Sequence, residues 1–380
     1  MGKSREREHR AFLAWLLEVI RAQEVEALLV SGDIFDTGTP PNYALELYYD
    51  FLKELSSIET LHSTIITAGN HDSVSTLKAP QELLRVLNVH VITSGDESEE
   101  VVIPIYANQE LQAIICAVPF LRDGVIRSSL SGESINQKEK LANAGIKAYY
   151  AKCHHEALEL RGDQDIPLIA MGHLTMVGSK ASESERDIYI GGTLDIGGSY
   201  LEGMFDYVAL GHLHINQRVG SERIRYSGSP IPLSFSEIKN RQKVNIVTIG
   251  SKNIEVDELE IPRVRELIVL KGDQKSIEEE LQKISDKEAW IEVHLRDDNP
   301  MAANQSIRAL ATKLRLTLLV LKIERSPKEI QAKQMKAISL QELSITELFN
   351  KRLELEELES KALKEELKSS FKEVLERVQS

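Results

Sequence analysis

The stretch YVALGHLH (207–214) decides the fold, because it joins a short apolar run to a glycine and two histidines. Such a run is typical of a strand that is buried on both faces of a parallel sheet. The same design occurs in LLVSGD (28–33), IITAGNHD (65–72) and LIAMGH (168–173). Glycine at a strand end lets the backbone turn sharply or approach a bound group closely. The pattern predicts an α/β fold with polar side chains at the ends of its parallel strands.

These polar side chains predict a metal site. Ligands of open α/β sheets bind at the carboxyl ends of the strands. A single Asp, Asn or His in such a place is more often a helix cap or a structural residue, but a fourfold repeat favours one shared site. Carboxylate, amide and imidazole together suit manganese, iron or zinc, and a cluster this rich predicts two ions about 3.5–4 Å apart. The residues that we expect to converge on one edge of one sheet are Asp33, Asn70, His71, His173, His212 and His214.

Composition narrows the class of protein. The formal charge of −13 argues against a surface made for nucleic acid, although a total says nothing about how the charge is distributed. Two cysteines, Cys116 and Cys153, give neither a disulfide framework nor a zinc spacing, which favours a reducing cytoplasm. No apolar run approaches the ~18 residues of a membrane span, and the first residues lack the apolar core of a signal peptide. No GxxxxGK[ST] motif is present, so any dependence on ATP has to come from a partner.

The motifs resemble a known superfamily. GDIFD (32–36), GNHD (69–72), GH (172–173) and GHLH (211–214), in this order, resemble the calcineurin-like metallophosphoesterases. Within that superfamily the chain resembles the SbcD family, the nuclease subunits of bacterial SbcCD DNA-repair complexes. The stretches that extend this resemblance are TGTPPNYALELY (37–48), RGDQDIPLIAMGHLTMVG (161–178), RDIYIGGTLD (186–195), RYSGSPIPLSF (225–235) and ELFNKRLELEEL (347–358). It implies a metallophosphoesterase β-sandwich flanked by helices, a small α/β capping domain and a helical tail.

The resemblance also implies roles for the predicted ligands. Asp33 is similar to the carboxylate that bridges two Mn²⁺ ions, and Asn70, His173 and His212 to the other ligands of the second ion. His214 is similar to a ligand of the first ion. The family's first strand ends in an Asp-x-His motif that supplies that ion's remaining ligands, and no such motif precedes GDIFD, so we expect the first strand to be absent. The hypothesis is one firmly bound ion and another bound weakly or not at all.

For the chemistry, the resemblance implies hydrolysis of a DNA phosphodiester by a metal-activated water. His71 would then protonate the leaving oxygen, and Asp36 either orients His71 or is only a turn residue. Asp72 is expected to be a helix cap. The GSP stretch (228–230) either lines the path of the phosphate or forms a plain turn.

Three domains are predicted. They are a metallophosphoesterase nuclease domain (1–262, without its first strand), a capping domain (263–326) and a helical partner-docking tail (327–380). The capping domain is expected to alternate strand 266–272, helix 276–284, strand 289–295, helix 306–315 and strand 316–324. One apolar face of the tail is formed by Leu363, Leu367, Phe371, Val374 and Val378. Such a face either packs on its own domain or docks on a partner, which the resemblance identifies as an SbcC-type coiled-coil ATPase.

Oligomeric state and activity each leave alternatives open. The segments 43–55 and 80–87 either pack on the sheet or form the face of a homodimer within a heterotetramer, and exposure of Tyr48 and Tyr49 would favour the dimer. The leading function is a metal-dependent DNA nuclease subunit, acting as a double-strand exonuclease and a single-strand or hairpin endonuclease with the ATPase. The alternatives are a small-substrate metallophosphoesterase, or an inactive assembly or DNA-binding subunit because the first metal motif is absent.

Overall fold

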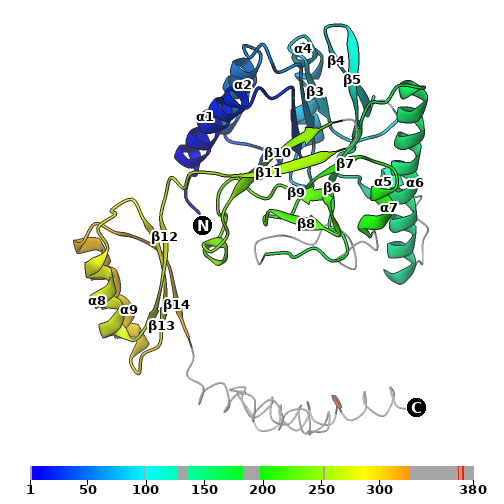
Figure 1. Cartoon of the computed structure of the whole chain (residues 1–380). Helices are drawn as coiled ribbons and strands as arrows, with labels where there is room; N and C mark the ends of the chain where they lie inside the picture. The colour runs from blue at the N-terminus through cyan, green and yellow to red at the C-terminus, as the bar shows by residue number, and fades with distance from the viewer. Residues whose placement is uncertain are drawn as a thin grey trace. The chain divides into compact units, whose positions relative to one another are not determined.

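The computed structural model describes residues 2–97, 99–126, 135–182, 197–250 and 253–324, together with residues 367, 370 and 371. They divide into a first unit, Met1–Ile268 with Glu288–Trp290, and a second unit that holds Val269–Lys287 and the residues from Ile291 onward (Figure 1). Among the described residues no helix is long and apolar enough to cross a membrane. The predicted apolar face of the tail lies almost wholly outside the described residues, so the tail and its boundaries remain predictions.

The first unit contains two main sheets and a hairpin. A parallel three-stranded sheet has the order β1-β2-β3, and a six-stranded sheet has the order β4-β5-β6-β7-β9-β8 with β5, β6, β7 and β9 parallel. The strands are β1 (Ala27–Ser31), β2 (Ser63–Thr67), β3 (Val89–Ile92), β4 (Val102–Ala107), β5 (Glu110–Ala117), β6 (Leu168–His173), β7 (Tyr207–Gly211), β8 (Gln217–Val219), β9 (Ser221–Tyr226), and the hairpin β10 (Lys243–Ile249) with β11 (Ile254–Glu260). This arrangement confirms the predicted α/β class.

The prediction that the four motif strands share one sheet is wrong. β1 and β2 belong to the three-stranded sheet, whereas β6 and β7 belong to the six-stranded sheet. The two sheets meet where these strands end, since the Ser31 hydroxyl donates to the Ala209 carbonyl oxygen over 3.0 Å. A Cβ atom at Gly211 would overlap the Ser31 carbonyl oxygen, and one at Gly69 would overlap the Asp33 carboxylate. Glycine therefore lets the strand ends of two different sheets come together at one place.

Helices cover the sheets and complete the cores. Leu16 and Ile20 of α1 and Leu52 of α2 are buried in one cluster with β2 and β3, and α1 and α2 lie side by side (Figure 1). Tyr150 of α6 is buried in a second cluster with β5, β6 and β7. The helices of this unit are α1 (Glu6–Ala22), α2 (Asn42–Leu55), α3 (Val74–Lys78), α4 (Gln81–Arg85), α5 (Asp123–Ile126), α6 (Ile135–Arg161), α7 (Gly198–Glu202) and the 3₁₀ turn η1 (Phe235–Glu237).

Burial differs between the motif strands. Every residue of β2 and β6 is buried, as predicted for strands covered on both faces. Every residue of β1 is partly exposed, so the prediction of two-sided burial is wrong there. The reason is position, because among the described residues β1 pairs only with β2 and forms an edge of its sheet.

The second unit is built on a three-stranded sheet with α8 and α9 on one face (Figure 1). Its elements are β12 (Leu267–Gly272), α8 (Gln274–Lys283), β13 (Trp290–Leu295), α9 (Pro300–Lys313) and β14 (Thr317–Ile323), in the predicted alternating order. The helix α8 begins after Asp273, whose carboxylate accepts from the Ser276 amide over 2.8 Å. Helix α9 begins at Pro300, six residues before the prediction, because proline fits the first turn of a helix.

Candidate metal centre

The first group of predicted ligands follows β1 and β2. Asp33 has a φ of 51° and comes directly after Gly32, whose φ is 84°. A non-glycine residue in this left-handed region is uncommon and is found where the surrounding structure holds it in place. One Asp33 oxygen accepts from the His71 amide over 3.1 Å, which leaves the other oxygen to face His173. The turn after β1 thus points a carboxylate across to the second sheet.

Three ligand atoms gather between the sheets. Ligand atoms of Asp33, His173 and His212 all lie within 4.8 Å of one another. The His173 Nε2 atom is 3.2 Å from the Asp33 Oδ2 atom and 2.9 Å from the Asn70 Oδ1 atom. The rings of His173 and His212 stand edge to face, with centroids 5.3 Å apart. Four of the six predicted residues are therefore brought together at one point.

The contacts of His173 show that this point suits a cation. Its Nδ1 atom lies 2.9 Å from the Ser31 carbonyl oxygen, which can only accept, so Nδ1 carries the hydrogen in the neutral ring. The Nε2 atom then presents a lone pair, and so do the Asp33 and Asn70 oxygens beside it. With His173 neutral, three lone pairs converge without a hydrogen between them, and a metal ion satisfies all three. A carboxylate, an amide oxygen and two imidazoles are a donor set for a divalent ion such as manganese or zinc.

Electrostatics keep two of these residues in the protonation state that binds metal. Burial alone would raise the pKa of Asp33, but when the metal-free site holds a proton on His173, the hydrogen bond and charge of that ring outweigh burial and lower the pKa to about 2. Burial, followed by the neighbouring His173, lowers the pKa of His212 to about 4. At neutral pH Asp33 is therefore ionised and His212 is neutral. Metal binding at this site needs no release of a proton from either residue.

His71 and His214 are not among the three residues whose ligand atoms converge, and each has a different partner. The His214 Nδ1 atom is 2.9 Å from the Glu237 Oε1 atom. The His71 Nδ1 atom is 2.8 Å from the main-chain carbonyl oxygen of Asp36. The Asp36 carboxylate is farther from that nitrogen, at 3.7 Å, and its side chain is 92% exposed. Asp36 therefore contacts His71 mainly through its backbone.

Asp72 is not the helix cap that the sequence predicts. Ser73 caps α3, since its hydroxyl accepts from the Thr76 amide over 3.3 Å. The buried Asp72 carboxylate instead accepts from three backbone amides, those of Ile34 (3.1 Å), Phe35 (2.9 Å) and Gly69 (2.8 Å). It therefore ties the loop after β1 to the loop after β2. A short sequence pattern cannot reveal this role, because the two loops are more than thirty residues apart.

Two further observations concern the loop after β9. In the GSP stretch the Ser229 hydroxyl is buried and donates to the Ile231 carbonyl oxygen over 3.0 Å, which favours the plain turn. Eight residues later the chain places Glu237 against His214, a contact that the motifs did not predict. The only signal for it would have been a carboxylate in an otherwise apolar segment, PIPLSFSEI (230–238).

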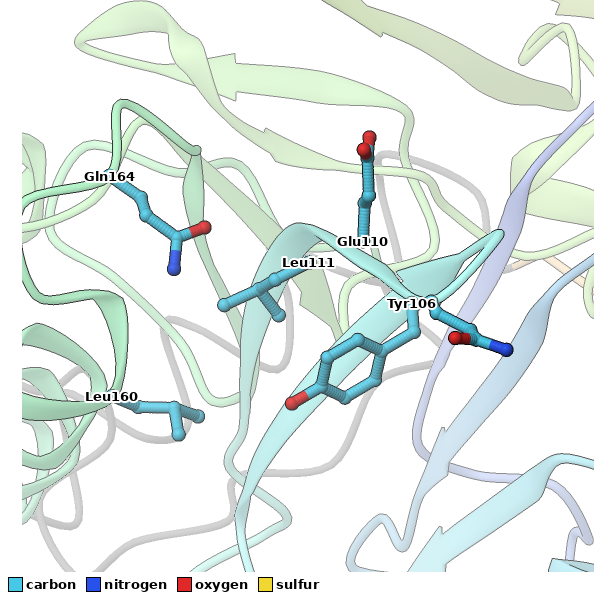
Figure 2. A pocket seen from close by; sticks show the side chains of 6 residues that line it. Tyr106, Glu110, Leu111, Leu160 and Gln164 are labelled. Carbon is cyan, nitrogen blue, oxygen red and sulfur yellow. The ribbon is translucent and has the colours of Figure 1, made fainter.

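A hollow elsewhere in the first unit is not part of this centre. Its volume is about 510 Å³, and Figure 2 shows the side chains at its wall. Glu110 and Leu111 lie at the amino end of β5, whereas the candidate ligands follow the carboxyl ends of strands. The residues that line it are Tyr106, Gln109, Glu110, Leu111, Leu160 and Gln164, none of which is a predicted ligand.

Comparisons with known families first define the class. Residues 6–216 match the family model of the calcineurin-like phosphoesterases. Residues 263–357 match the model SbcD_C, described as the type 5 capsule protein repressor C-terminal domain. The fold is thus that of a calcineurin-like phosphoesterase with an additional C-terminal module, a family that binds divalent metal.

Individual relatives narrow the class to one family. The SbcD subunit of nuclease SbcCD from Escherichia coli K12 is 40% identical over 365 residues, which cover 94% of this chain and 90% of that protein. The SbcD subunits from Rhodobacter capsulatus and Bacillus subtilis are 38% and 32% identical; the matches cover 66% and 65% of this chain and 63% and 62% of those proteins. The chain therefore belongs to the SbcD family of calcineurin-like phosphoesterases, as its motifs predict.

Proposed function

We propose that this protein is a metal-dependent nuclease subunit that hydrolyses DNA phosphodiester bonds together with an SbcC-type ATPase. The observation that carries the proposal is the convergence of lone pairs from Asp33, Asn70 and His173 beside a neutral His212. Membership of the SbcD family supports the nucleic-acid substrate, since the relatives are named as nuclease subunits.

Metal binding and proton transfer fall to different residues. Asp33, Asn70, His173 and His212 hold one divalent ion, for which we propose Mn²⁺, while Asp33 and His214 contribute to a second and weaker site. When bound, the ions polarise the phosphate and lower the pKa of a water molecule. His71 protonates the leaving oxygen, and because its Nδ1 atom is held by the Asp36 carbonyl, the exchange of protons falls to Nε2.

Two side chains after β5, Phe120 and Arg122, support a proposal about how the nucleic acid binds. The ring of Phe120 stands edge-on to His173, with centroids 6.4 Å apart. The guanidinium of the exposed Arg122 lies 5.8 Å from the Phe120 ring centroid and donates to the Asp72 carbonyl oxygen over 3.2 Å. An arginine beside the His71 loop offers a phosphate the fork of donors that it prefers. We propose that Arg122 binds a phosphate next to the bond that is cleaved.

We also propose the assembly that the family suggests, a homodimer within a heterotetramer. Support comes from α4 and the residue that follows it, since Leu83 is 72% exposed and Val86 is 78% exposed. Apolar side chains so exposed are a common feature of protein interfaces. The expectation for the two tyrosines holds only in part, because Tyr49 is exposed but Tyr48 is buried. The two free and buried cysteines agree with a cytoplasmic location.

The test combines metal binding with two assays of activity. His173→Ala should abolish the tightest Mn²⁺ site in titration calorimetry and with it the cleavage of duplex and hairpin DNA. His155→Ala is the matched control, because that histidine is exposed on α6. Unchanged Mn²⁺ binding in His173→Ala would refute the metal site. Activity on a nitrophenyl phosphoester without activity on DNA would favour a small-substrate phosphoesterase, and metal binding without any hydrolysis would favour an assembly subunit.

A further inference from the structure

We propose that Glu237 is the positioning residue for His214 and thereby sets the occupancy of the weaker metal site. This inference rests on the proposed function, because it assumes that His214 is a ligand. The Glu237 side chain is 1% exposed, and its Oε1 atom lies 2.9 Å from the His214 Nδ1 atom. A carboxylate buried this deeply is stable only when donors surround it.

The surroundings of Glu237 fix the position of its carboxylate. The Leu233 amide donates to Oε2 over 2.8 Å, and the Ser182 hydroxyl donates to Oε1 over 3.0 Å. The segment that carries Glu237 is itself held, because the Arg5 guanidinium donates to the Pro232 carbonyl oxygen over 2.9 Å. A carboxylate held by an amide, a hydroxyl and an imidazole cannot turn away to follow the ring. The ring of His214 therefore adopts the orientation that the carboxylate imposes.

The contact also selects the tautomer of His214. An ionised carboxylate only accepts, so the Nδ1 atom of His214 carries the hydrogen and the Nε2 atom keeps its lone pair for a ligand bond. Metal-binding histidines commonly donate their second ring N–H to a carboxylate, which fixes the ring and makes it a better ligand. His173 achieves the same result with the Ser31 carbonyl oxygen. Both rings are thus prepared to use Nε2 for binding.

The two metal positions should depend on Glu237 to different degrees. The tighter position includes His173, whose ring is oriented by the Ser31 carbonyl oxygen instead of a carboxylate. The weaker position is expected to have only Asp33 and His214 among the described residues, and Glu237 orients one of these two. Loss of a carboxylate partner of a metal-bound histidine typically costs about 10–100-fold in metal affinity. We expect Glu237→Gln to weaken the second Mn²⁺ ion by about this factor and to leave the first ion unchanged.

Two measurements test the proposal on the full chain. In the metal-free wild type with ¹⁵N-labelled histidine, NMR should show His214 protonated at Nδ1, the resonance being assigned by its loss in His214→Asn. Mn²⁺ titration by calorimetry and electron paramagnetic resonance should show the selective weakening in Glu237→Gln. Glu18→Gln, on an exposed position of α1, is the matched control and should match the wild type.

The possible results either support or overturn the role of Glu237. An Nε2–H tautomer in the wild type, the absence of a second bound ion in the wild type, or unchanged affinity for both ions in Glu237→Gln would each overturn the proposal. If Glu237→Gln does not fold, the wild-type tautomer and Ser182→Ala decide, since Ser182→Ala removes one donor to the same carboxylate. Ser182→Ala should then weaken the second ion alone, and equal affinities would count against the proposal. Failure of the proposed function is distinct, because it would show as unchanged metal binding in His173→Ala.

Discussion

The two sheets hold their parts of the site by different means. On the side of β1 and β2, the loops are fixed through the backbone, with the Asp72 carboxylate on three amides and the Asp36 carbonyl oxygen on His71. On the side of β6 and β7, the imidazole rings are fixed one by one, as with His173 on Ser31. A metal ligand on a loop therefore needs hydrogen bonds that fix the backbone of the loop. A ligand at the end of a strand already has a fixed backbone and needs only a partner that orients its ring.

The largest effect is expected from His71→Asn, which separates chemistry from metal binding. His71 belongs to the loop side but lies outside the cluster of Asp33, His173 and His212. Removing a general acid typically costs about 10²–10⁴-fold in rate. DNA cleavage should fall by about that factor while calorimetry shows unchanged Mn²⁺ affinity. If the tight ion were lost as well, His71 would be a ligand and not a proton donor.

The second largest effect is expected from Asp72→Ala, which removes the carboxylate that connects the loop after β1 to the loop after β2. Three backbone amides, two of them fully buried, would lose their acceptor, and each buried loss costs about 1–3 kcal/mol. The free energy of unfolding in denaturant should fall by at least about 3 kcal/mol, and Mn²⁺ affinity should fall with it. Asp206→Ala is the matched control, since that carboxylate accepts from one backbone amide, that of Leu168, at the start of β6. Equal losses of stability and of Mn²⁺ affinity in both variants would show that the connection between the two loops through Asp72 has no special role.

On the side of β6 and β7, we expect His212 to make the stability of the protein depend on pH. Burial lowers the pKa of His212 to about 4 from an ordinary value of 6.5. Below pH 6.5 the unfolded chain binds a proton there that the folded chain does not, so stability is complete above pH 6.5 and is lost as the pH falls toward 4. The loss amounts to at most about 3 kcal/mol. With a metal chelator present, the free energy of unfolding of His212→Asn should depend less on pH between 4 and 6.5 than that of the wild type. The exposed control His155→Asn should behave as the wild type. Equal pH dependence in His212→Asn and the wild type would contradict the lowered pKa of His212.

Sequence reasoning succeeds where the pattern is local. Each strand–glycine motif identifies its own ligand, and the alternating elements from β12 to β14 follow from their apolar periods. It fails where the partner is distant. The sequence could not show that β1 and β6 lie in different sheets, because a buried strand reads alike in both. Nor could it show that Glu237 meets His214, because strands β8 and β9 and the loop after β9 lie between them in the chain.

The smallest effect is expected from Asp36→Ala, and it tests whether the loop side really acts through its backbone. The His71 ring is 2.8 Å from the Asp36 carbonyl oxygen, which the substitution keeps, and 3.7 Å from a carboxylate that is almost fully exposed. An exposed charge at that distance is screened by water, and surface substitutions usually change free energies by less than about 0.5 kcal/mol. The rate of DNA cleavage should therefore change by no more than about twofold. A fall of tenfold or more, with Mn²⁺ affinity unchanged, would mean that the carboxylate turns inward onto His71 during catalysis, and the contrast between the two sides would then disappear.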